Sequence, residues 1–348
     1  MRILYGVQGT GNGHLTRARV VAPALARAGI EVDYLFSGRD RLQPFGDFRC
    51  YQGLTFATSN GQIQLAATAL NNNLWRCWRD IQQLDLSRYD LVLNDFEPIS
   101  AWAARRQQLT CIGISHQNAF LQAVPITGDS PLNQLILRYF APATVALGCH
   151  WHHFGCQLLP PFVEPITAAS RCSGRVLVYL PFEHADAIVA LLNALPQQRF
   201  SVFHGSQPNV ACGPHVQWHG FSRDGFAAEL RACAGVIASA GFELASEALV
   251  LGKKLLLKPL QGQFEQLSNA LALELLGVAT VINRLEVTAV NTWLAAPSIE
   301  PIGYPPVADT LVRWLLAGDW GDIDGLCQQA WQPAKLPDSW QHKWATAY

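Results

Sequence analysis

The sequence predicts an α/β protein made of two Rossmann-like domains, each a doubly wound parallel sheet, that face one another across a cleft. Short apolar runs of strand length alternate with helix-like segments, as they do in βαβ units. Half of the 348 residues are hydrophobic and only 15% are charged, which is typical of buried parallel sheets and unlike a disordered chain. The length suffices for two domains, each with its own core.

The expected strands form two series. The first is Arg2–Val7, Glu31–Phe36, Tyr89–Asn94, Thr110–Ser115 and Ala143–Gly148, and the second is Arg175–Leu180, Arg199–His204, Gly235–Ala238, Lys254–Lys258 and Val278–Ile282. Helix-like segments separate most of them, including Leu15–Ala28, Gln62–Asp80, Ile99–Gln107 and Phe226–Cys233. The helical spacing of apolar residues supports the first of these helices, and Pro23 inside it predicts a kink.

The segment Leu159–Pro165 is the most proline-dense part of the chain and separates the two series. Prolines hold a linker extended and cannot continue a strand ladder. We therefore expect an N-terminal domain at 1–160, a linker at 161–174, a C-terminal domain at 175–305 and a helical C-terminal segment at 306–348.

Composition excludes several classes of partner. The net charge is −1 and no block of Lys and Arg stands out, so we expect no nucleic-acid binding. No apolar run approaches the roughly 20 residues that cross a bilayer, and the first apolar run is too brief for a signal peptide. The expectation is a cytoplasmic protein without a transmembrane segment. Peripheral membrane contact through the aromatic tail stays open as an alternative to packing on the domain surfaces; its tryptophans are Trp320, Trp331, Trp340 and Trp344.

Nine cysteines without regular spacing argue against a disulfide framework. Four potential zinc ligands gather in one short segment, namely Cys149, His150, His152 and Cys156. Their spacing fits no known zinc-finger pattern, and Cys and His are also ordinary residues of buried strands. We favour the second interpretation and predict no metal site.

The stretch from Gly235 to Ala270 is the most informative part of the chain. It reads as an apolar strand, a small-residue turn at Ser239, Ala240 and Gly241, a helix with acidic residues near its start, a second apolar strand and a polar loop. A helix N-terminus at the carboxyl end of a buried strand offers unpaired N–H groups and a positive dipole end to an anion. The turn is small enough for a phosphate to approach the backbone.

Two carboxylates, Glu243 and Glu247, lie four residues apart on one face of that helix. A carboxylate can accept both hydroxyls of a ribose, whereas it repels a phosphate. The combination predicts a nucleotide with its diphosphate at the turn and its ribose one helical turn further along.

The order of these residues resembles the donor-binding signature of GT-B glycosyltransferases that use nucleotide-diphosphate sugars. It is most similar to the branch that contains the lipid-II-forming N-acetylglucosaminyl transferase and to the wider UDP-glycosyltransferases. The resemblance rests on Ser239, Gly241, Glu247, Gly252, Pro259, Glu265, Gln266, Asn269 and Ala270, which follow the family's order. The chain departs from the pattern at Phe242, which is bulky, and at Lys258, where an apolar residue is usual.

The resemblance implies residue roles. Glu247 holds the ribose, Glu265 and Gln266 hold sugar hydroxyls, and Gly241 and its neighbours receive the diphosphate. It also implies that the first domain binds the acceptor, the second binds the donor, and the final helix crosses back to the first domain. Pro306–Ala317 is our candidate for that helix.

The first apolar run leads into a glycine loop, Gly9-Thr10-Gly11-Asn12-Gly13, followed by His14 and Arg17. The spacing is neither the dinucleotide fingerprint nor a Walker A loop. Alternate glycines leave backbone N–H groups facing outward. With His14 and Arg17, the loop resembles the first loop of the same GT-B branch, which contacts the acceptor and the donor diphosphate; our candidates here are Gly11, Asn12 and Gly13.

Glycosyl transfer with inversion needs a base for the acceptor hydroxyl and stabilisation of the departing diphosphate. His14 is the candidate base, because it follows the glycine loop and an imidazole titrates near neutral pH. The alternative is a histidine that caps or packs the first helix. Asp95 ends a predicted strand and either orients His14, takes the proton itself, or caps the helix that begins near Pro98; Glu97 is a less favoured substitute.

Further candidates are positional. His116 follows a predicted strand and would line the acceptor pocket. Phe182 ends the first strand of the second series, and Phe221 precedes a helix where this fold holds the base of the nucleotide. No Asp-x-Asp motif occurs at a plausible strand end, so we expect the helix N-terminus at Gly241 to stabilise the leaving group without a metal.

The leading hypothesis is therefore a metal-independent, inverting glycosyltransferase that moves a sugar from a nucleotide diphosphate, chiefly UDP, to a hydroxyl acceptor. It needs no cofactor, since the nucleotide-sugar is a co-substrate. Two alternatives stay open: a sugar-nucleotide epimerase of the same fold, and a nucleotide-sugar-binding protein without turnover. A nicotinamide dehydrogenase fits the glycine spacing less well.

Overall fold

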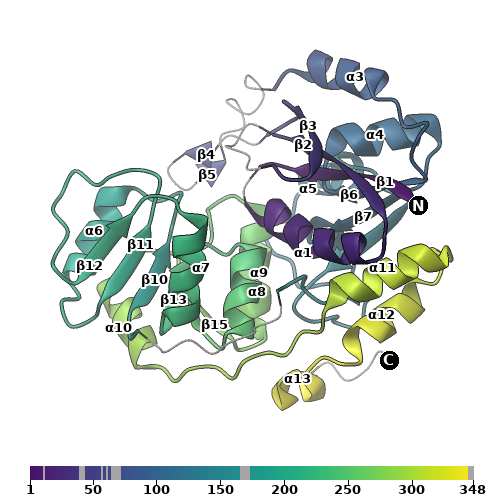
Figure 1. Cartoon of the computed structure of the whole chain (residues 1–348). Coiled ribbons are helices and arrows are strands. Elements are labelled where there is room, and N and C mark those ends of the chain that lie inside the picture. Colours follow the sequence, from purple (N-terminus) through teal and green to yellow (C-terminus); the bar gives the residue numbers. More distant parts are fainter. Residues whose placement is uncertain are drawn as a thin grey trace.

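The structure is a computed structural model that describes residues 1–10, 12–38, 44–55, 58–59, 62–63, 72–164 and 173–343. Two α/β lobes lie side by side, the first formed by the N-terminal half and the second by the elements from β10 to α10 (Figure 1). Each lobe is built on a parallel sheet with helices on both faces. The predicted fold class is confirmed.

The sheet of the first lobe has, within the described residues, the strand order β3-β2-β1-β6-β7-β8-β9, and all its pairs are parallel. Its central strands are buried along their whole length, which explains their near-continuous apolar sequence. The strands are β1 Arg2–Gln8, β2 Glu31–Ser37, β3 Asp47–Tyr51, β6 Leu91–Asp95, β7 Cys111–Ser115, β8 Val145–Cys149 and β9 Leu158–Leu159.

The second sheet has the order β12-β11-β10-β13-β14-β15 in the part of the chain that the structure describes, again with parallel pairs. Its strands are short, and β13 and β11 are buried throughout. They are β10 Val176–Tyr179, β11 Phe200–Phe203, β12 Val216–His219, β13 Gly235–Ala238, β14 Lys254–Leu257 and β15 Ala279–Val281.

The helices of the first lobe are α1 Gly13–Arg27, α3 Leu74–Gln83, α4 Pro98–Gln107, the 3-10 helix η1 Gln117–Leu121 and α5 Pro131–Tyr139. Those of the second lobe are α6 Ala185–Asn193, α7 Arg223–Ala232, α8 Phe242–Val250, α9 Phe264–Leu275 and α10 Val287–Ala295. The first helix is one continuous element through Pro23.

Two sequence expectations need correction. Part of the helix expected over Gln62–Asp80, at 64–71, lies outside the described residues. Its start is wrong, because Gln62–Ile63 form the strand β5, which pairs antiparallel with β4 (Thr58–Ser59), and its end belongs to α3, which begins at Leu74. Strands β3 and β12 carry no continuous apolar run and were missed. Both are edge strands, β3 largely exposed and β12 half-buried, so nothing forces their side chains to be apolar.

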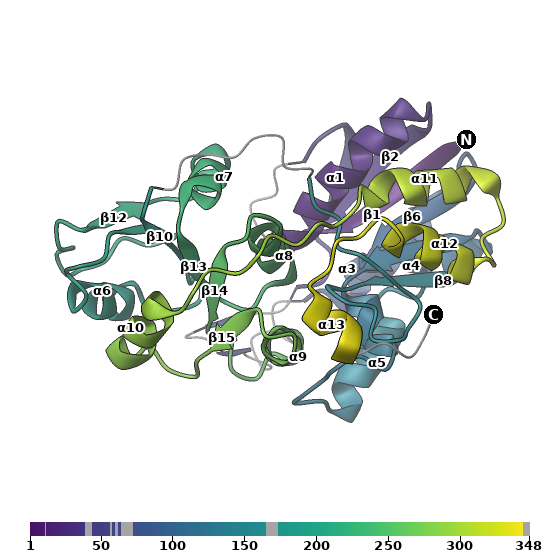
Figure 2. The same cartoon turned by 90° about the horizontal axis from the view of Figure 1, so that it is seen from below.

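The C-terminal helices lie against the first lobe: α11 (Val307–Ala317) runs beside α1, and α12 (Ile323–Trp331) contacts α11 and β9 (Figure 2). The indole of Trp331 donates a hydrogen bond to the Leu158 carbonyl of the first lobe. The short α13 (Asp338–Lys343) places Trp340 against the second lobe, where its indole donates to the Leu276 carbonyl. The C-terminal helices thus contact both lobes, and the domain division at 160, 174 and 305 stays a proposal.

Candidate functional site

In each sheet there is one topological switch point, where the chain stops adding strands on one side of the first strand and continues on its other side. In the first sheet it lies between β1 and β6, and in the second between β10 and β13. Ligands of open parallel sheets bind at the carboxyl ends of the strands at such points. The glycine loop and α1 follow β1, the turn and α8 follow β13, and α1 and α8 contact one another. The two switch points therefore meet at one site between the lobes.

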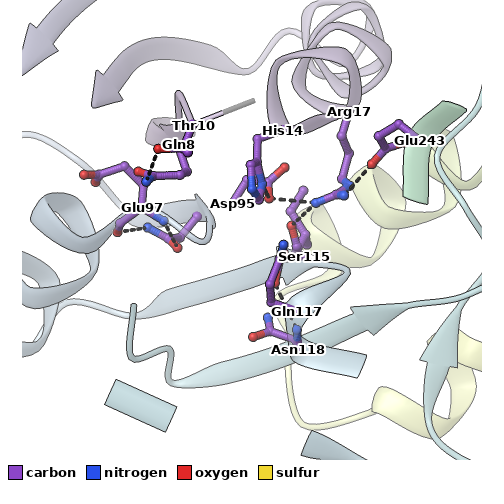
Figure 3. Close-up of polar contacts among 12 residues, drawn as sticks. Gln8, Thr10, His14, Arg17, Asp95, Glu97, Ser115, Gln117, Asn118 and Glu243 are labelled. Atoms are coloured by element: carbon purple, nitrogen blue, oxygen red, sulfur yellow. Dashed lines mark hydrogen bonds and ion pairs between the residues drawn. The ribbon is translucent and has the colours of Figure 1, made fainter. Parts of the chain in front are cut away.

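His14 and Asp95 form the centre of the site (Figure 3). His14 lies in the first turn of α1 and Asp95 is the last residue of β6. Nδ1 of His14 lies 2.7 Å from Oδ1 of Asp95, and the carboxylate is fully buried. Because the carboxylate can only accept, Nδ1 carries the proton and Nε2 is left with its lone pair. The pair has the geometry of an oriented general base.

The capping alternative for Asp95 is wrong, because Glu97 performs that task. The Glu97 carboxylate accepts hydrogen bonds from the backbone N–H groups of Ile99 (2.8 Å) and Ser100 (2.6 Å) at the start of α4. It also accepts from the hydroxyls of Ser37 and Ser100. With these four bonds Glu97 stabilises the entry of α4, so it is not a substitute for Asp95.

Arg17 joins Asp95 to the second lobe. One end of its guanidinium, Nη1, donates to Oδ1 of Asp95 at 2.7 Å, and the other, Nη2, donates to the Glu243 carboxylate of α8 (Figure 3). Burial alone would lower the pKa of Arg17, but the carboxylates of Asp95 and Glu243 outweigh it and hold the pKa well above its usual value. Glu243, expected from sequence as a donor ligand, is thus an ion-pair partner of the first lobe.

The turn before α8 is open in front of the helix. Gly241 is the N-cap residue and α8 has no side-chain cap. A Cβ added at Gly241 would meet no atom within 4 Å, so space lies directly before the helix N-terminus. The other turn residues are held from behind: the Ala240 carbonyl accepts from the Asn269 amide at 2.9 Å, and the Ser239 carbonyl accepts from Gly241 N–H at 2.8 Å. The arrangement fits an anion.

Glu247 lies one turn further along α8 and is half-buried. Burial, together with the nearby charges of Glu243 and Glu164, raises the pKa of Glu247 to about 7. Unlike Glu243, whose carboxylate is paired with Arg17, Glu247 forms no ion pair among the described residues. The charge of Glu247 therefore changes near neutral pH, so the affinity for a ligand that contacts it depends on pH in this range.

Behind the turn, His116 joins the lobes. Its Nδ1 lies 2.8 Å from the Cys149 carbonyl and its Nε2 lies 2.7 Å from Oδ1 of Asn269. Burial lowers the pKa of His116, and these two contacts act in the opposite direction. The ring stacks on Phe242 with centroids 3.9 Å apart, and Trp151 packs on the same phenyl ring. The bulky Phe242, a departure from the family pattern, is thus part of the interlobe packing, and His116 is not free to bind an acceptor.

Glu265 and Gln266, at the start of α9, make different contacts. Oε2 of Glu265 accepts a hydrogen bond from the Gln117 amide of the first lobe at 3.0 Å. Gln266 is buried, and its side-chain oxygen accepts from the Leu260 backbone N–H at 2.9 Å. Lys258 forms an ion pair with Glu183 at 2.5 Å, so its amine is already neutralised. Glu265 is half-buried, whereas Gln266 is buried.

The remaining candidates lie around the site or outside the described residues. Phe221 is 62% exposed, so it is not a core residue, and Phe182 is half-buried. Asn12 is exposed and hydrogen-bonded to Tyr179 of the second lobe. An added Cβ at Gly13 would lie 3.1 Å from Cγ of Glu243, so this glycine allows α8 to approach. Gly11 lies outside the described residues.

The Cys/His segment that begins at the end of β8 packs against neighbouring side chains. Cys149 and His150 are buried, and burial lowers the pKa of His150 well below its usual value. Within the described residues no three His, Cys, Asp or Glu side chains are arranged to hold a metal ion. Of the helices that the structure describes, none is both long and apolar enough to cross a bilayer.

Sequence reasoning missed the partners that cross between the lobes. Arg17 and Glu243 lie 226 positions apart, and His116 and Asn269 lie 153 apart. The Trp151 indole also donates to the Ser246 hydroxyl of α8 at 2.9 Å. A signal for Asn269 existed, since it stands in the family pattern, but no local pattern states which residue it meets.

A model of glycosyl transferase family 1 matches residues 1–297. The chain belongs to this family. Glycosyl transfer is therefore its activity, and the resemblance inferred from Gly235–Ala270 is confirmed. No curated protein matches the sequence significantly.

Solved structures of glycosyltransferases share the fold. The chain is similar to the glycotransferase of kitacinnamycin, with a TM-score of 0.59, 15% identity and coverage of 97% of this chain and 99% of that one. It is also similar to Arabidopsis thaliana UGT89C1 complexed with UDP (TM-score 0.61, 12% identity, 94% and 99% covered). A third is Acinetobacter baumannii MurG (TM-score 0.52, 17% identity, 99% and 98% covered). At these identities the likeness shows the GT-B fold.

Proposed function

We propose that this family member transfers a sugar from a UDP-sugar to a hydroxyl acceptor, with inversion and without a metal. The observation that carries the proposal is that the His14–Asp95 pair and the uncapped N-terminus of α8 lie at the same interlobe site. One provides a base and the other a place for a departing diphosphate. The UDP complex of a protein with the same fold supports the choice of nucleotide.

The chemistry follows from these two parts. The acceptor hydroxyl loses its proton to Nε2 of His14, while its oxygen forms a bond to the anomeric carbon of the donor. The bond from that carbon to the diphosphate oxygen breaks, and its electron pair leaves with the diphosphate. A single displacement from the face opposite the leaving group inverts the anomeric centre. Asp95 stabilises the imidazolium that forms on His14.

The charge that develops on the diphosphate falls to the N–H groups and dipole of α8. We propose that Ser239, Ala240 and Gly241 surround it, that Glu247 accepts the ribose hydroxyls, and that Glu265 contacts the sugar. Phe182 and Phe221 would flank the nucleotide, and Asn12 and Gly13 would line the acceptor side.

The test is an incubation with single UDP-sugars and a panel of hydroxyl acceptors in the presence of EDTA, with products followed by mass spectrometry and by anomeric proton NMR. The proposal expects a glycosylated product of inverted configuration and stoichiometric UDP. Free sugar with UDP and no glycoside would favour the epimerase. Tight UDP binding without turnover on any acceptor would favour a binding protein.

A further inference from the structure

Among the described contacts, Arg17 is the one residue of α1 that contacts both the His14–Asp95 pair and helix α8. Its side chain is 2% exposed, and each Nη atom meets a different carboxylate. Nη1 also lies 3.5 Å from the Ile114 carbonyl at the end of β7. The resemblance implies that the glycine loop before Arg17 contacts the diphosphate, but both ends of the Arg17 guanidinium are occupied by protein groups.

We propose that Arg17 is a positioning residue with two separable tasks: it neutralises Glu243 beside the diphosphate site, and it holds Asp95 in the orientation that His14 uses. The inference rests on the proposed function and names the residue that makes the two lobes act together.

The first task follows from the place of Glu243. It lies in the first turn of α8, where the same N–H groups and dipole that favour a diphosphate also favour a carboxylate. An unpaired Glu243 would repel the donor at short range. Burial raises the pKa of Glu243, and the charge of Arg17 opposes this and favours the ionised, paired form. With Arg17 in place the turn presents no net negative charge from this residue.

The second task follows from Asp95. Its Oδ1 accepts from both His14 and Arg17, and its Oδ2 has no hydrogen-bond partner among the described residues. The planar guanidinium therefore fixes the carboxylate against His14. Lysine offers a point charge in place of a fork, so it can neutralise Glu243 or Asp95 but cannot span both in this geometry.

The experiment compares Arg17→Met, Glu243→Gln and the double variant, with Arg27→Met, an exposed arginine of the same helix, as the matched control. UDP affinity is measured by calorimetry and kcat with a saturating donor. We expect Arg17→Met to lose at least about tenfold in UDP affinity and in kcat. The double variant should regain UDP affinity to within about threefold of the wild type, while kcat stays low. Arg17→Lys should keep more affinity than kcat.

A double variant that regains kcat as well as affinity, or that regains neither, overturns the assignment. The tie between the lobes is tested separately without ligand, by unfolding midpoints of the wild type, the two single variants Arg17→Met and Glu243→Gln, and the double variant. A pair that acts together gives a double variant less destabilised than the sum of the singles; additive shifts would contradict the tie. If the wild type binds no UDP, the proposed function fails, and this cycle still decides whether Arg17 and Glu243 couple the lobes.

Discussion

At the scale of single residues, the site is a set of charged side chains that lie where the switch points of the two sheets meet. Asp95 and Glu243 are buried carboxylates, and Arg17 lies between them with its charge shared. Breaking a buried pair leaves an uncompensated charge, so these residues are sensitive positions for stability as well as for activity. Glu247 differs, because it is not tied into this network and titrates near neutral pH.

This difference gives a pH dependence to donor binding. The raised pKa of Glu247, about 7, means that the carboxylate form gains population as the pH rises through that value. If the ribose requires the carboxylate, UDP affinity increases by about tenfold between about pH 6 and about pH 8. Calorimetric titrations at several pH values check this.

Glu247→Gln is the control for that experiment, because it removes the titrating group and keeps the shape. The ionisation of UDP itself affects both proteins equally, so it cancels in the comparison. The variant should bind more weakly at high pH and with a flatter dependence. An unchanged slope in Glu247→Gln would show that another group is responsible.

The residues that act locally were predictable and their partners were not. His14, Asp95 and Gly241 stand at the ends of apolar strands, and parallel strands bring their carboxyl ends to one edge. The role of Glu97 was harder, since Asp95 and Glu97 both precede α4 and either carboxylate could have capped it. The capping geometry decides between them, and it depends on backbone angles that sequence does not state.

At the scale of elements, α8 is the part that combines stability with function. Most helices benefit from a side chain at the N-cap, whereas the N-cap residue of α8 is Gly241, which has no side chain to form such a hydrogen bond. The uncapped start weakens the helix and leaves its first N–H groups to a ligand. The loss of stability at the start of α8 thus accompanies the gain of N–H groups that can bind an anion.

Gly241→Asp tests this relation. The aspartate would cap α8 and raise the free energy of unfolding by a few tenths of a kcal/mol, since glycine is itself a tolerated N-cap residue. It would also lower UDP affinity by at least about tenfold, since like charges about 5 Å apart repel by about 3 kcal/mol at an effective dielectric constant of about 20. Thermal unfolding and calorimetry measure the two effects.

Gly241→Ala is the matched control, because an added Cβ meets no atom within 4 Å and the backbone angles suit any residue. It should lower UDP affinity less than Gly241→Asp does, because its Cβ enters the space before α8 without adding a charge. An aspartate variant that binds UDP as well as the alanine variant would place the diphosphate elsewhere.

Strands that are buried on both faces were easier to predict than strands that are partly exposed. The strands β1, β6 and β13 carry continuous apolar runs because both faces are covered. The edge strand β3 is largely exposed and alternates charged with apolar residues, and the segment expected to begin a helix at Gln62 begins with the strand β5. At such places periodicity carries little information.

At the scale of the molecule, the two lobes share one apolar cluster. It runs from Val7 of β1 through Trp151 and Phe242 to Val236 of β13, and α11 and α12 extend it. The polar contacts of His116, Gln117 and Arg17 cross the same boundary. The fold class was predictable from two series of strands, whereas this interface depends on contacts between distant parts of the chain.

A shared cluster predicts that the lobes unfold together, in one calorimetric transition. Phe242→Ala should lower the free energy of unfolding by about 3–5 kcal/mol, as expected for a large buried aromatic ring. The exposed Phe221→Ala serves as the comparison and should change stability by less than about 1 kcal/mol. Two separate transitions in the wild type, or equal effects of the two variants, would contradict a shared core.

The measurement that tests the central claim most directly is the turnover and UDP affinity of His14→Ala beside the wild type, with a donor and acceptor found by the product screen. The structure predicts that kcat falls by about 10²–10⁴-fold while UDP binds with unchanged affinity, because the base is lost and the turn before α8 is intact. Wild-type turnover in the variant would mean that His14 is not the base and that the His14–Asp95 pair only supports the first helix.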